Sequence, residues 1–277
     1  DCQAITKKAI VERLKKAYEE KGWLNETGAK YPVEVAIHKD NVLLTIDTSG
    51  SGLNKRGYRL AQGEAPIKET LAASLIRLAN WKGDSPLIDP FCGSGTIAIE
   101  ACLIAQNIAP GFNRDFVSEE WNIMPPNIYD ELRDEADRMA DYDKEIEVYA
   151  SDIDPETVEI AKRNAEEVGL GDIIQFNVKD VNTLTIDSEG PVALVGNPPY
   201  GERIGDREEV EEMYRYIGSL MKQHPYLSTY ILTSNKEFEY LVNRKATKRR
   251  KLFNGYIECT YYQYWGCLLY TSPSPRD

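Results

Sequence analysis

The stretch Asn197-Pro198-Pro199-Tyr200, with the apolar run Val192 to Gly196 before it, decides the fold of this chain. The apolar run predicts a buried strand. The two prolines cannot continue a hydrogen-bonded ladder, so the strand must end there and the chain must turn rigidly. Because open α/β sheets place their chemistry at the carboxyl ends of strands, this turn is the first candidate site.

The turn carries groups that suit a flat base with an exocyclic amine. The amide oxygen of Asn197 and the carbonyl of Pro198 can each accept one amine hydrogen, and Tyr200 can stack on the ring. Pro199 completes this candidate catalytic turn. Arg203 fits a contact with guanine or a phosphate, but it equally fits an ion pair with a neighbouring carboxylate.

A second motif, Gly93-Ser94-Gly95, follows a short apolar strand that ends at Asp89. It leads into a helix expected over Ile97–Gln106. No Gly-Lys-Ser/Thr follows and no third glycine closes the motif, so it is neither a Walker loop nor a dinucleotide fingerprint. Taken alone, it also fits an ordinary tight turn between strand and helix.

Acidic residues stand at the ends of the next two expected strands. Asp152 follows the strand Ile146–Ser151, where a carboxylate can bind the ribose hydroxyls of an adenosine. Asp180 follows the strand Ile173–Val178. These two tips and the glycine turn predict a nucleoside-binding edge of the sheet.

Four motifs in this order resemble a known family: D-P-F-C-G-S-G-T (89–96), S-D-I-D-P (151–155), K-D (179–180) and N-P-P-Y-G-E-R (197–203). They resemble class I S-adenosylmethionine-dependent methyltransferases, and more narrowly the THUMP-domain RNA guanine-N2 methyltransferases related to the bacterial 23S rRNA enzymes. Proteins with this turn are often labelled N6-adenine-specific DNA methylases. The resemblance extends from Asp1 to Gly266.

The resemblance implies S-adenosylmethionine as methyl donor, S-adenosylhomocysteine as product, and no metal. It implies methylation of guanine N2 in 23S rRNA, with Tyr200, Arg203, Lys248, Arg249 and Arg250 contacting the RNA substrate. The implied cofactor-binding residues are Asp89, Phe91, Gly93, Gly95, Thr96, Asp152, Ile153, Asp180 and Asn197.

Other functions remain open at this stage. The Asn-Pro-Pro-Tyr turn also serves adenine N6 in DNA or RNA, and guanine N2 in tRNA is a further alternative. An RNA-binding protein that retains the fold without catalysis is the non-enzymatic alternative, although Asn197 and Asp89 are both present. A small-molecule or protein N-methyltransferase is disfavoured by the basic run at 243–251.

Strands alternating with helices predict an α/β protein with a seven-stranded, mostly parallel sheet and an antiparallel last strand. We expect a partial THUMP domain over residues 1–60 and a methyltransferase domain over 61–266, with an insertion at 108–143. Residues 267–277 resemble a translated sequencing adapter, and the abrupt start resembles the middle of a THUMP domain. The expected strands are Pro86–Asp89, Ile146–Ser151, Ile173–Val178, Val192–Gly196, Ser228–Thr233, Arg250–Phe253 and Tyr256–Trp265.

The composition is that of a globular protein. The chain has 277 residues, a net charge of −12 and two histidines. The five cysteines form no C-x-x-C pair, so a zinc site is disfavoured, and reduced thiols fit a cytoplasmic protein. We expect a monomer without membrane spans. Lys248, Arg249 and Arg250 lie in a basic run that is either an RNA-contacting face or a solvated turn before an edge strand.

Overall fold

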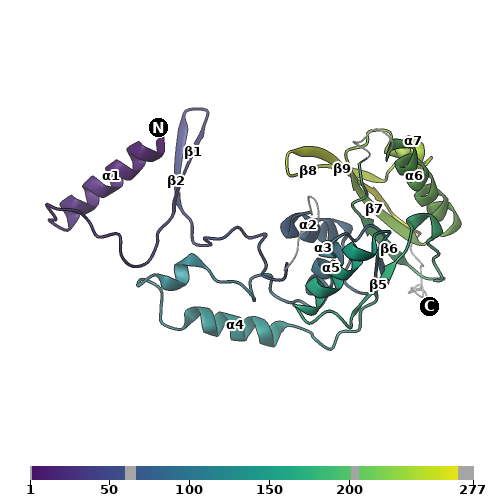
Figure 1. Ribbon diagram of the computed structural model, residues 1–277, viewed down its shortest axis with the longest axis horizontal. Coiled ribbons are helices and arrows are strands. Elements are labelled where there is room, and N and C mark those ends of the chain that lie inside the picture. Colours follow the sequence, from purple (N-terminus) through teal and green to yellow (C-terminus); the bar gives the residue numbers. More distant parts are fainter. Residues whose placement is uncertain (1, 60–66, 201–205, 268–277) are drawn as a thin grey trace, which may run out of the picture. The chain divides into compact units, whose positions relative to one another are not determined.

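The computed structural model describes residues 2–59, 67–200 and 206–267. The chain forms two compact units. One contains Asp1–Leu53 together with Arg114–Glu135, and the other contains Asn54–Asn113 together with Ala136–Asp277. The second unit carries the large sheet seen in Figure 1.

The large sheet has seven strands in the order β5-β4-β3-β6-β7-β9-β8. The first five pair in parallel, and β9 pairs antiparallel with both β7 and β8. This confirms the predicted α/β architecture, a seven-stranded and mostly parallel sheet with an antiparallel last strand. The strands are β3 (Leu87–Asp89), β4 (Val148–Asp152), β5 (Ile174–Val178), β6 (Val192–Gly196), β7 (Leu227–Thr233), β8 (Lys248–Asn254) and β9 (Ile257–Tyr264).

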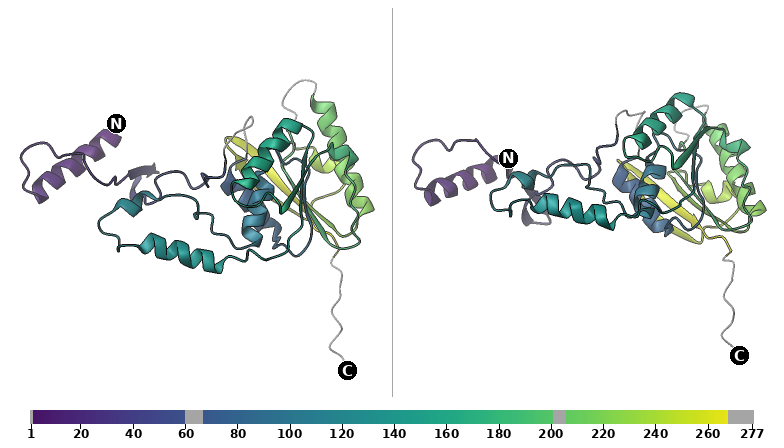
Figure 2. Two further views of the ribbon diagram at one scale, coloured as in Figure 1. Left: turned by 60° about the horizontal axis from the view of Figure 1, so that its bottom comes forward. Right: turned by 90° about the horizontal axis from the view of Figure 1, so that it is seen from below.

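Helices cover both faces of this sheet, as Figure 2 shows. On one face α2 (Glu69–Ala79), α3 (Thr96–Ala105) and α5 (Pro155–Glu166) bury Leu75, Ile99 and Ala161 in one apolar cluster. On the other, α6 (Asp206–Gln223) and α7 (Phe238–Leu241) bury Ile217 and Phe238 in a second cluster. A short 3-10 helix, η2 (Val181–Thr183), follows β5. The two clusters hold the strands' carboxyl ends in place.

The last hairpin differs from the sequence-based expectation in the bounds of its strands and in its turn residues. Its first strand begins at Lys248 rather than Arg250, because the ladder with β9 extends to the pair Lys248–Gln263. Asn254 pairs with Ile257 as the last residue of β8, so Gly255 and Tyr256 form the turn. Asn254 is therefore a strand residue, and its side chain is available for contacts outside the turn.

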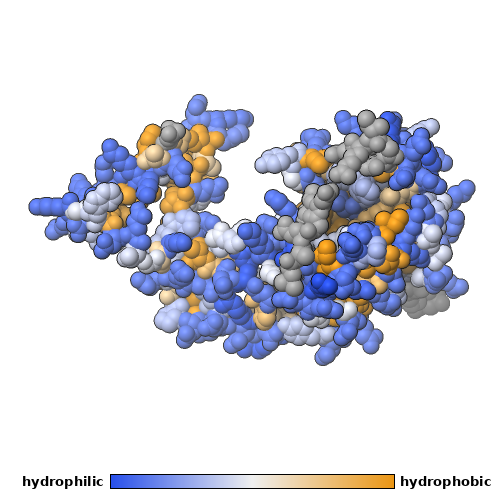
Figure 3. Space-filling model, in the orientation of Figure 1, coloured by the Kyte–Doolittle hydropathy of each residue, from blue (hydrophilic) through white to orange (hydrophobic). Residues whose placement is uncertain are grey.

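The smaller unit contains α1 (Cys2–Ala17) and an antiparallel pair, β1 (Val33–His38) and β2 (Asn41–Ile46). The register places six apolar side chains on one face of the pair, and five of them are exposed, as the orange patch in Figure 3 shows. These six residues are Val33, Val35, Ile37, Val42, Leu44 and Ile46.

The first part of the insertion packs within this smaller unit. The Trp121 ring stacks on Tyr31 with centroids 4.7 Å apart, and its Nε1 donates to the carbonyl of Lys30 over 2.7 Å. Arg114 donates to the carbonyls of Ser49, Ser51 and Gly52. The insertion also contains the 3-10 helix η1 (Val117–Glu120) and the helix α4 (Ile128–Met139).

Candidate active site

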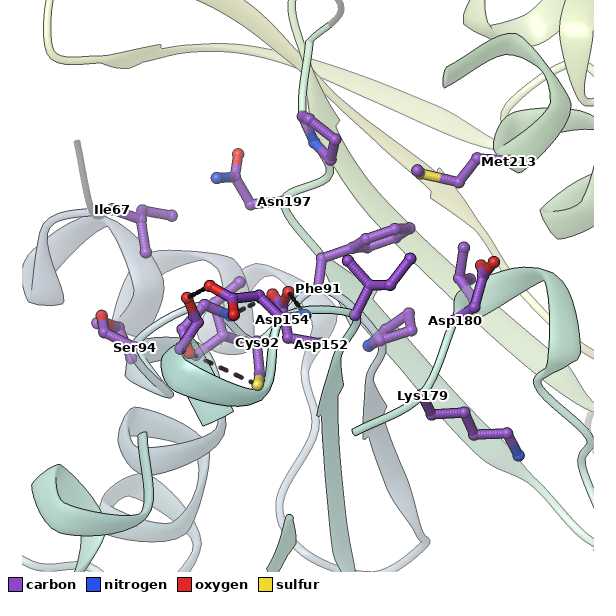
Figure 4. Close-up of a pocket in the computed structure, with 18 residues that line it drawn as sticks. Ile67, Phe91, Cys92, Ser94, Asp152, Asp154, Lys179, Asp180, Asn197 and Met213 are labelled. Carbon is purple, nitrogen blue, oxygen red and sulfur yellow. Dashed lines mark hydrogen bonds between the residues drawn. The ribbon is translucent and has the colours of Figure 1, made fainter. Parts of the chain in front are cut away.

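A cavity of about 550 Å³ opens at the carboxyl ends of β3, β4, β5 and β6. Eight of the residues predicted from the sequence line it, and Figure 4 shows Asn197 and Asp180 well apart among the side chains around it. The eight are Phe91, Gly93, Thr96, Asp152, Ile153, Asp180, Asn197 and Pro199.

Asp152 connects two of the loops that form the cavity. Its Oδ2 accepts the backbone N–H of Gly93 over 3.0 Å, and its Oδ1 accepts the N–H of Asp154 over 3.1 Å. Each carboxylate oxygen has a second lone pair, so ligand hydroxyls can still donate to it. The next residue, Ile153, is apolar, lines the cavity and is 68% exposed. The tip of β4 thus offers acceptors beside an apolar surface.

The two glycines of the turn after β3 have different roles. Both have positive φ, 51° at Gly93 and 82° at Gly95. A Cβ at Gly93 would meet nothing within 4 Å, whereas at Gly95 it would lie 3.1 Å from the Cβ of Ala161 in α5. Gly93 therefore keeps the cavity open. Gly95, predicted to bind the cofactor, does not line the cavity but allows α5 to pack against the turn.

Asp89, also predicted to bind the cofactor, is fully buried and does not line the cavity. Its Oδ1 accepts the N–H of Phe91 over 3.2 Å, and its Oδ2 has no hydrogen-bond partner among the described residues. Burial raises the pKa of this carboxyl to about 8, and the nearby charge of Asp152 adds to the shift. Asp89 thus supports the turn rather than the cavity wall.

The Asn-Pro-Pro-Tyr turn is held from two sides. On one side, the Tyr200 hydroxyl donates to Asn197 Oδ1 over 2.6 Å, and Asn254 Nδ2 donates to the same hydroxyl over 3.1 Å. On the other, the Tyr214 hydroxyl of α6 donates to the carbonyl of Pro199 over 3.3 Å. Rigid support of this kind is what a side chain needs to act on a bound substrate.

Tyr200 and Pro198 do not line the cavity, unlike Asn197 and Pro199. Pro198 is buried, and the half-buried ring of Tyr200 packs against the main apolar cluster. The structure therefore directs Tyr200 toward Asn197 and Asn254 rather than toward open space.

Three of the five predicted RNA-binding residues, Lys248, Arg249 and Arg250, lie on β8 and do not share one face. Successive side chains alternate along a strand, so Lys248 and Arg250 point to one side and Arg249 to the other. The Arg249 Nε lies 3.1 Å from the Glu239 carboxylate. Lys248 and Arg250 thus share one side of the edge strand, and Arg249 lies on the other with its acidic partner. Arg203 lies outside the described residues.

Other cavity residues were not among the predicted site residues. They include Ile67, Ser94, Asp154, Lys179 and Met213, labelled in Figure 4. Lys179 stands directly before Asp180 in the quoted K-D pair, so the motif could have indicated Lys179 as a cavity residue. Met213 lies three residues after the buried Val210 on α6 and looks like an ordinary core residue in the sequence.

Cys92 also lines the cavity, and the sequence favoured a packing role for it. The side chain is buried, and burial raises the pKa of its thiol above the ordinary value. A thiol that stays protonated is a poor nucleophile, which agrees with packing.

The described residues contain no group of three or more His, Cys, Asp or Glu placed to hold a metal ion. In the same part of the chain, every helix is too short or too polar to cross a membrane.

Comparison with known proteins identifies the family. A profile described as "RMKL-like, methyltransferase domain" matches residues 56–263. The chain belongs to the RMKL-like methyltransferase family. The family predicted from the four motifs is thereby confirmed, and S-adenosylmethionine is the methyl donor of this methyltransferase class, as predicted.

Two curated relatives span most of the chain. The Bacillus subtilis protein named "Putative RNA methyltransferase YpsC" is 56% identical over 96% of this chain and 69% of its own length. Ribosomal RNA large subunit methyltransferase K/L of Shewanella baltica (strain OS155) is 37% identical over 98% of this chain and 38% of its own length. The chain thus spans about two fifths of the second relative.

Two solved structures share the fold. SMU.472, a methyltransferase homologue complexed with SAH, is 42% identical with a TM-score of 0.90, covering 96% of this chain and 70% of its own. A Listeria monocytogenes protein described as a predicted N6-adenine-specific DNA methylase is 53% identical with a TM-score of 0.89, covering 96% and 69%.

Proposed function

We propose that this RMKL-like methyltransferase transfers a methyl group to the exocyclic amine of a base in RNA, with guanine N2 of large-subunit rRNA as the first candidate. One observation carries the proposal. Asn197, whose amide oxygen can accept from an amine, lines the same cavity as Asp152, Ile153 and Asp180, which suit a nucleoside.

The charge of the cavity suits a cationic nucleoside ligand. Among the described residues that line the cavity, the three carboxylates of Asp152, Asp154 and Asp180 outnumber the ammonium group of Lys179. An excess of negative charge favours a ligand that carries a sulfonium and an ammonium. We assign the ribose hydroxyls to Asp152, the adenine face to Ile153 and the adenine amine to Asp180.

When bound, S-adenosylmethionine supplies a methyl group on sulfur, which moves in line to the attacking nitrogen and leaves a neutral thioether. The protein has to hold the amine in line with that methyl group, because orientation supplies much of the rate. Asn197 Oδ1, which lines the cavity, would accept one amine hydrogen, which helps draw the nitrogen lone pair out of conjugation with the ring. The proton displaced from nitrogen then leaves to water.

RNA is the favoured substrate because the names of both curated relatives specify RNA or ribosomal RNA. The basic residues of β8 support the same assignment, since phosphate contacts require lysine or arginine. Lys248 is exposed at the start of this edge strand. A few such contacts supply local attraction to phosphates despite the net charge of −12.

Adenine N6 in DNA is the second candidate. The description of the Listeria monocytogenes structure favours it, and the amide oxygen of Asn197 suits either amine. Methylation of guanine N2 and methylation of adenine N6 give different modified nucleosides. The identity of the methylated nucleoside therefore distinguishes the two candidates.

The test is methylation of in-vitro-transcribed large-subunit rRNA and of a duplex DNA of matched length, with nucleoside mass spectrometry of the products. We expect N2-methylguanosine from the RNA and no methylated nucleoside from the DNA. N6-methyldeoxyadenosine from the DNA would replace the first candidate with the second.

A further inference from the structure

Three side chains form a hydrogen-bonded chain that ends on the candidate catalytic amide. Asn254 Nδ2 donates to the Tyr200 hydroxyl over 3.1 Å, and that hydroxyl donates to Asn197 Oδ1 over 2.6 Å. Asn254 lies at the end of β8, 57 residues beyond Asn197 in the sequence. The hairpin β8–β9 is thereby connected to the turn after β6.

The chain has a fixed polarity. An amide nitrogen can only donate, so the Tyr200 oxygen is the acceptor toward Asn254, and the single hydroxyl proton must go to Asn197. Burial raises the pKa of Tyr200 above its ordinary value, with a contribution from the Cys259 thiol. The hydroxyl therefore remains protonated at neutral pH and keeps its role as donor.

This polarity decides which end of the Asn197 amide is presented to a ligand. The two ends of an amide have nearly the same size, and their orientation follows from the hydrogen bonds around them. Tyr200 occupies one lone pair of Oδ1 and leaves the second available for another donor. With the amide reversed, Nδ2 would face an incoming amine, and two donors would oppose each other.

We propose that Asn254 is a positioning residue that, acting through the Tyr200 hydroxyl, fixes the amide oxygen of Asn197 as the acceptor for the target amine. This inference rests on the proposed function. It also gives Tyr200 a role that fits its position away from the cavity wall. Tyr200 would orient the catalytic amide whether or not its ring contacts the base.

The decisive variant is Asn254→Asp, which keeps the shape and reverses the polarity. An aspartate at position 254 would accept the hydroxyl proton, so the Tyr200 oxygen could only accept from Asn197. Single-turnover methyl transfer to in-vitro-transcribed large-subunit rRNA should slow about 10- to 100-fold. S-adenosylmethionine affinity, measured by calorimetry, should change less than about twofold, because Asn254 does not line the cavity.

Two further variants separate this effect from general damage. Asn177→Asp adds the same charge at an exposed position of β5 and should keep the wild-type rate. Tyr200→Phe removes the hydroxyl, so the double variant Tyr200→Phe with Asn254→Asp should be no slower than Tyr200→Phe alone. Multiplicative losses in the double variant, or a wild-type rate for Asn254→Asp, would overturn the proposal.

A spectroscopic readout tests the same chain without RNA. In protein labelled with ¹⁵N-asparagine, the Asn197 side-chain amide signal is assigned by its loss in Asn197→Asp. Asn254→Asp should shift that signal in the wild-type background and leave it unchanged in the Tyr200→Phe background. An unshifted signal overturns the positioning role. A wild-type protein that methylates no RNA overturns the proposed function alone.

Discussion

The carboxylate of Asp152 accepts the backbone N–H of Gly93 through Oδ2 over 3.0 Å. This contact joins the loop after β3 to the loop after β4, and both loops line the cavity. A single side chain thus joins two walls of the cavity and offers acceptors to a ligand. A substitution of Asp152 should therefore alter the conformation of both loops, the one after β3 and the one after β4.

Asp152→Ala should weaken S-adenosylmethionine binding by about 1–3 kcal/mol, because ligand donors and the N–H of Gly93 lose their acceptor. Isothermal titration calorimetry measures the change. Asp143→Ala, which removes an exposed carboxylate elsewhere, is the control and should bind like wild type. Unchanged affinity in Asp152→Ala would remove Asp152 from the proposed cofactor site.

The two glycines of the turn should differ when changed to alanine. Gly93→Ala should cost about 1–2 kcal/mol of stability from its positive φ, and its methyl group should enter the cavity and weaken cofactor binding. Gly95→Ala should cost more, about 2–4 kcal/mol, because its methyl group also presses on Ala161. Urea unfolding ranks the two variants, and the reverse order would contradict these assigned roles.

Asp89 should make stability depend on pH. Its pKa is about 8 in the folded protein, raised from 3.8, so between these values the folded state holds a proton that the unfolded state has released. Stability therefore decreases as pH rises through this window, by up to about 1.4 kcal/mol per pH unit from this group.

Asp89→Asn keeps the shape and removes the titration. The difference in unfolding free energy between Asp89→Asn and wild type should grow in favour of the variant from about pH 5 to about pH 7 and level off above about pH 9. Urea unfolding at several pH values measures it. Parallel pH profiles for the two proteins would show that Asp89 does not carry the raised pKa.

Much of the fold of the unit that carries the large sheet can be predicted from local patterns in the sequence. The apolar run Val192–Gly196 followed by two prolines predicts β6 with the same bounds as the structure. Asp152 and Asp180 stand at strand ends, and both line the cavity as expected. These features are local, since strand alternation, proline and glycine act on their immediate neighbours.

The features that sequence reasoning missed depend on distant contacts or on side-chain direction. Asn254 next to Gly255 reads as a hairpin turn, and only the pairing of β8 with β9 turns it toward Tyr200. Asp89 ends its strand as a ligand-binding acid would, yet it is fully buried and accepts the backbone N–H of Phe91 in the following turn. Neither outcome is visible in the spacing of residues.

The basic strand β8 allows a matched comparison. Lys248→Ala should weaken RNA binding and lower the slope of log affinity against log salt by about 1, the effect of one lost phosphate contact. Arg249→Ala should leave that slope unchanged, because Arg249 pairs with Glu239 on the other face. Filter binding across a salt series measures both, and equal slopes for the two variants would contradict the assignment.

The account rests on Asn197 as the acceptor that activates the target amine, and Asn197→Ala tests this most directly. Calorimetry and single-turnover methylation of large-subunit rRNA are measured on the same preparation, with Asn177→Ala as the control. We predict S-adenosylmethionine affinity within about twofold of wild type and a methyl-transfer rate at least about 100-fold lower. A wild-type rate in Asn197→Ala would contradict the account.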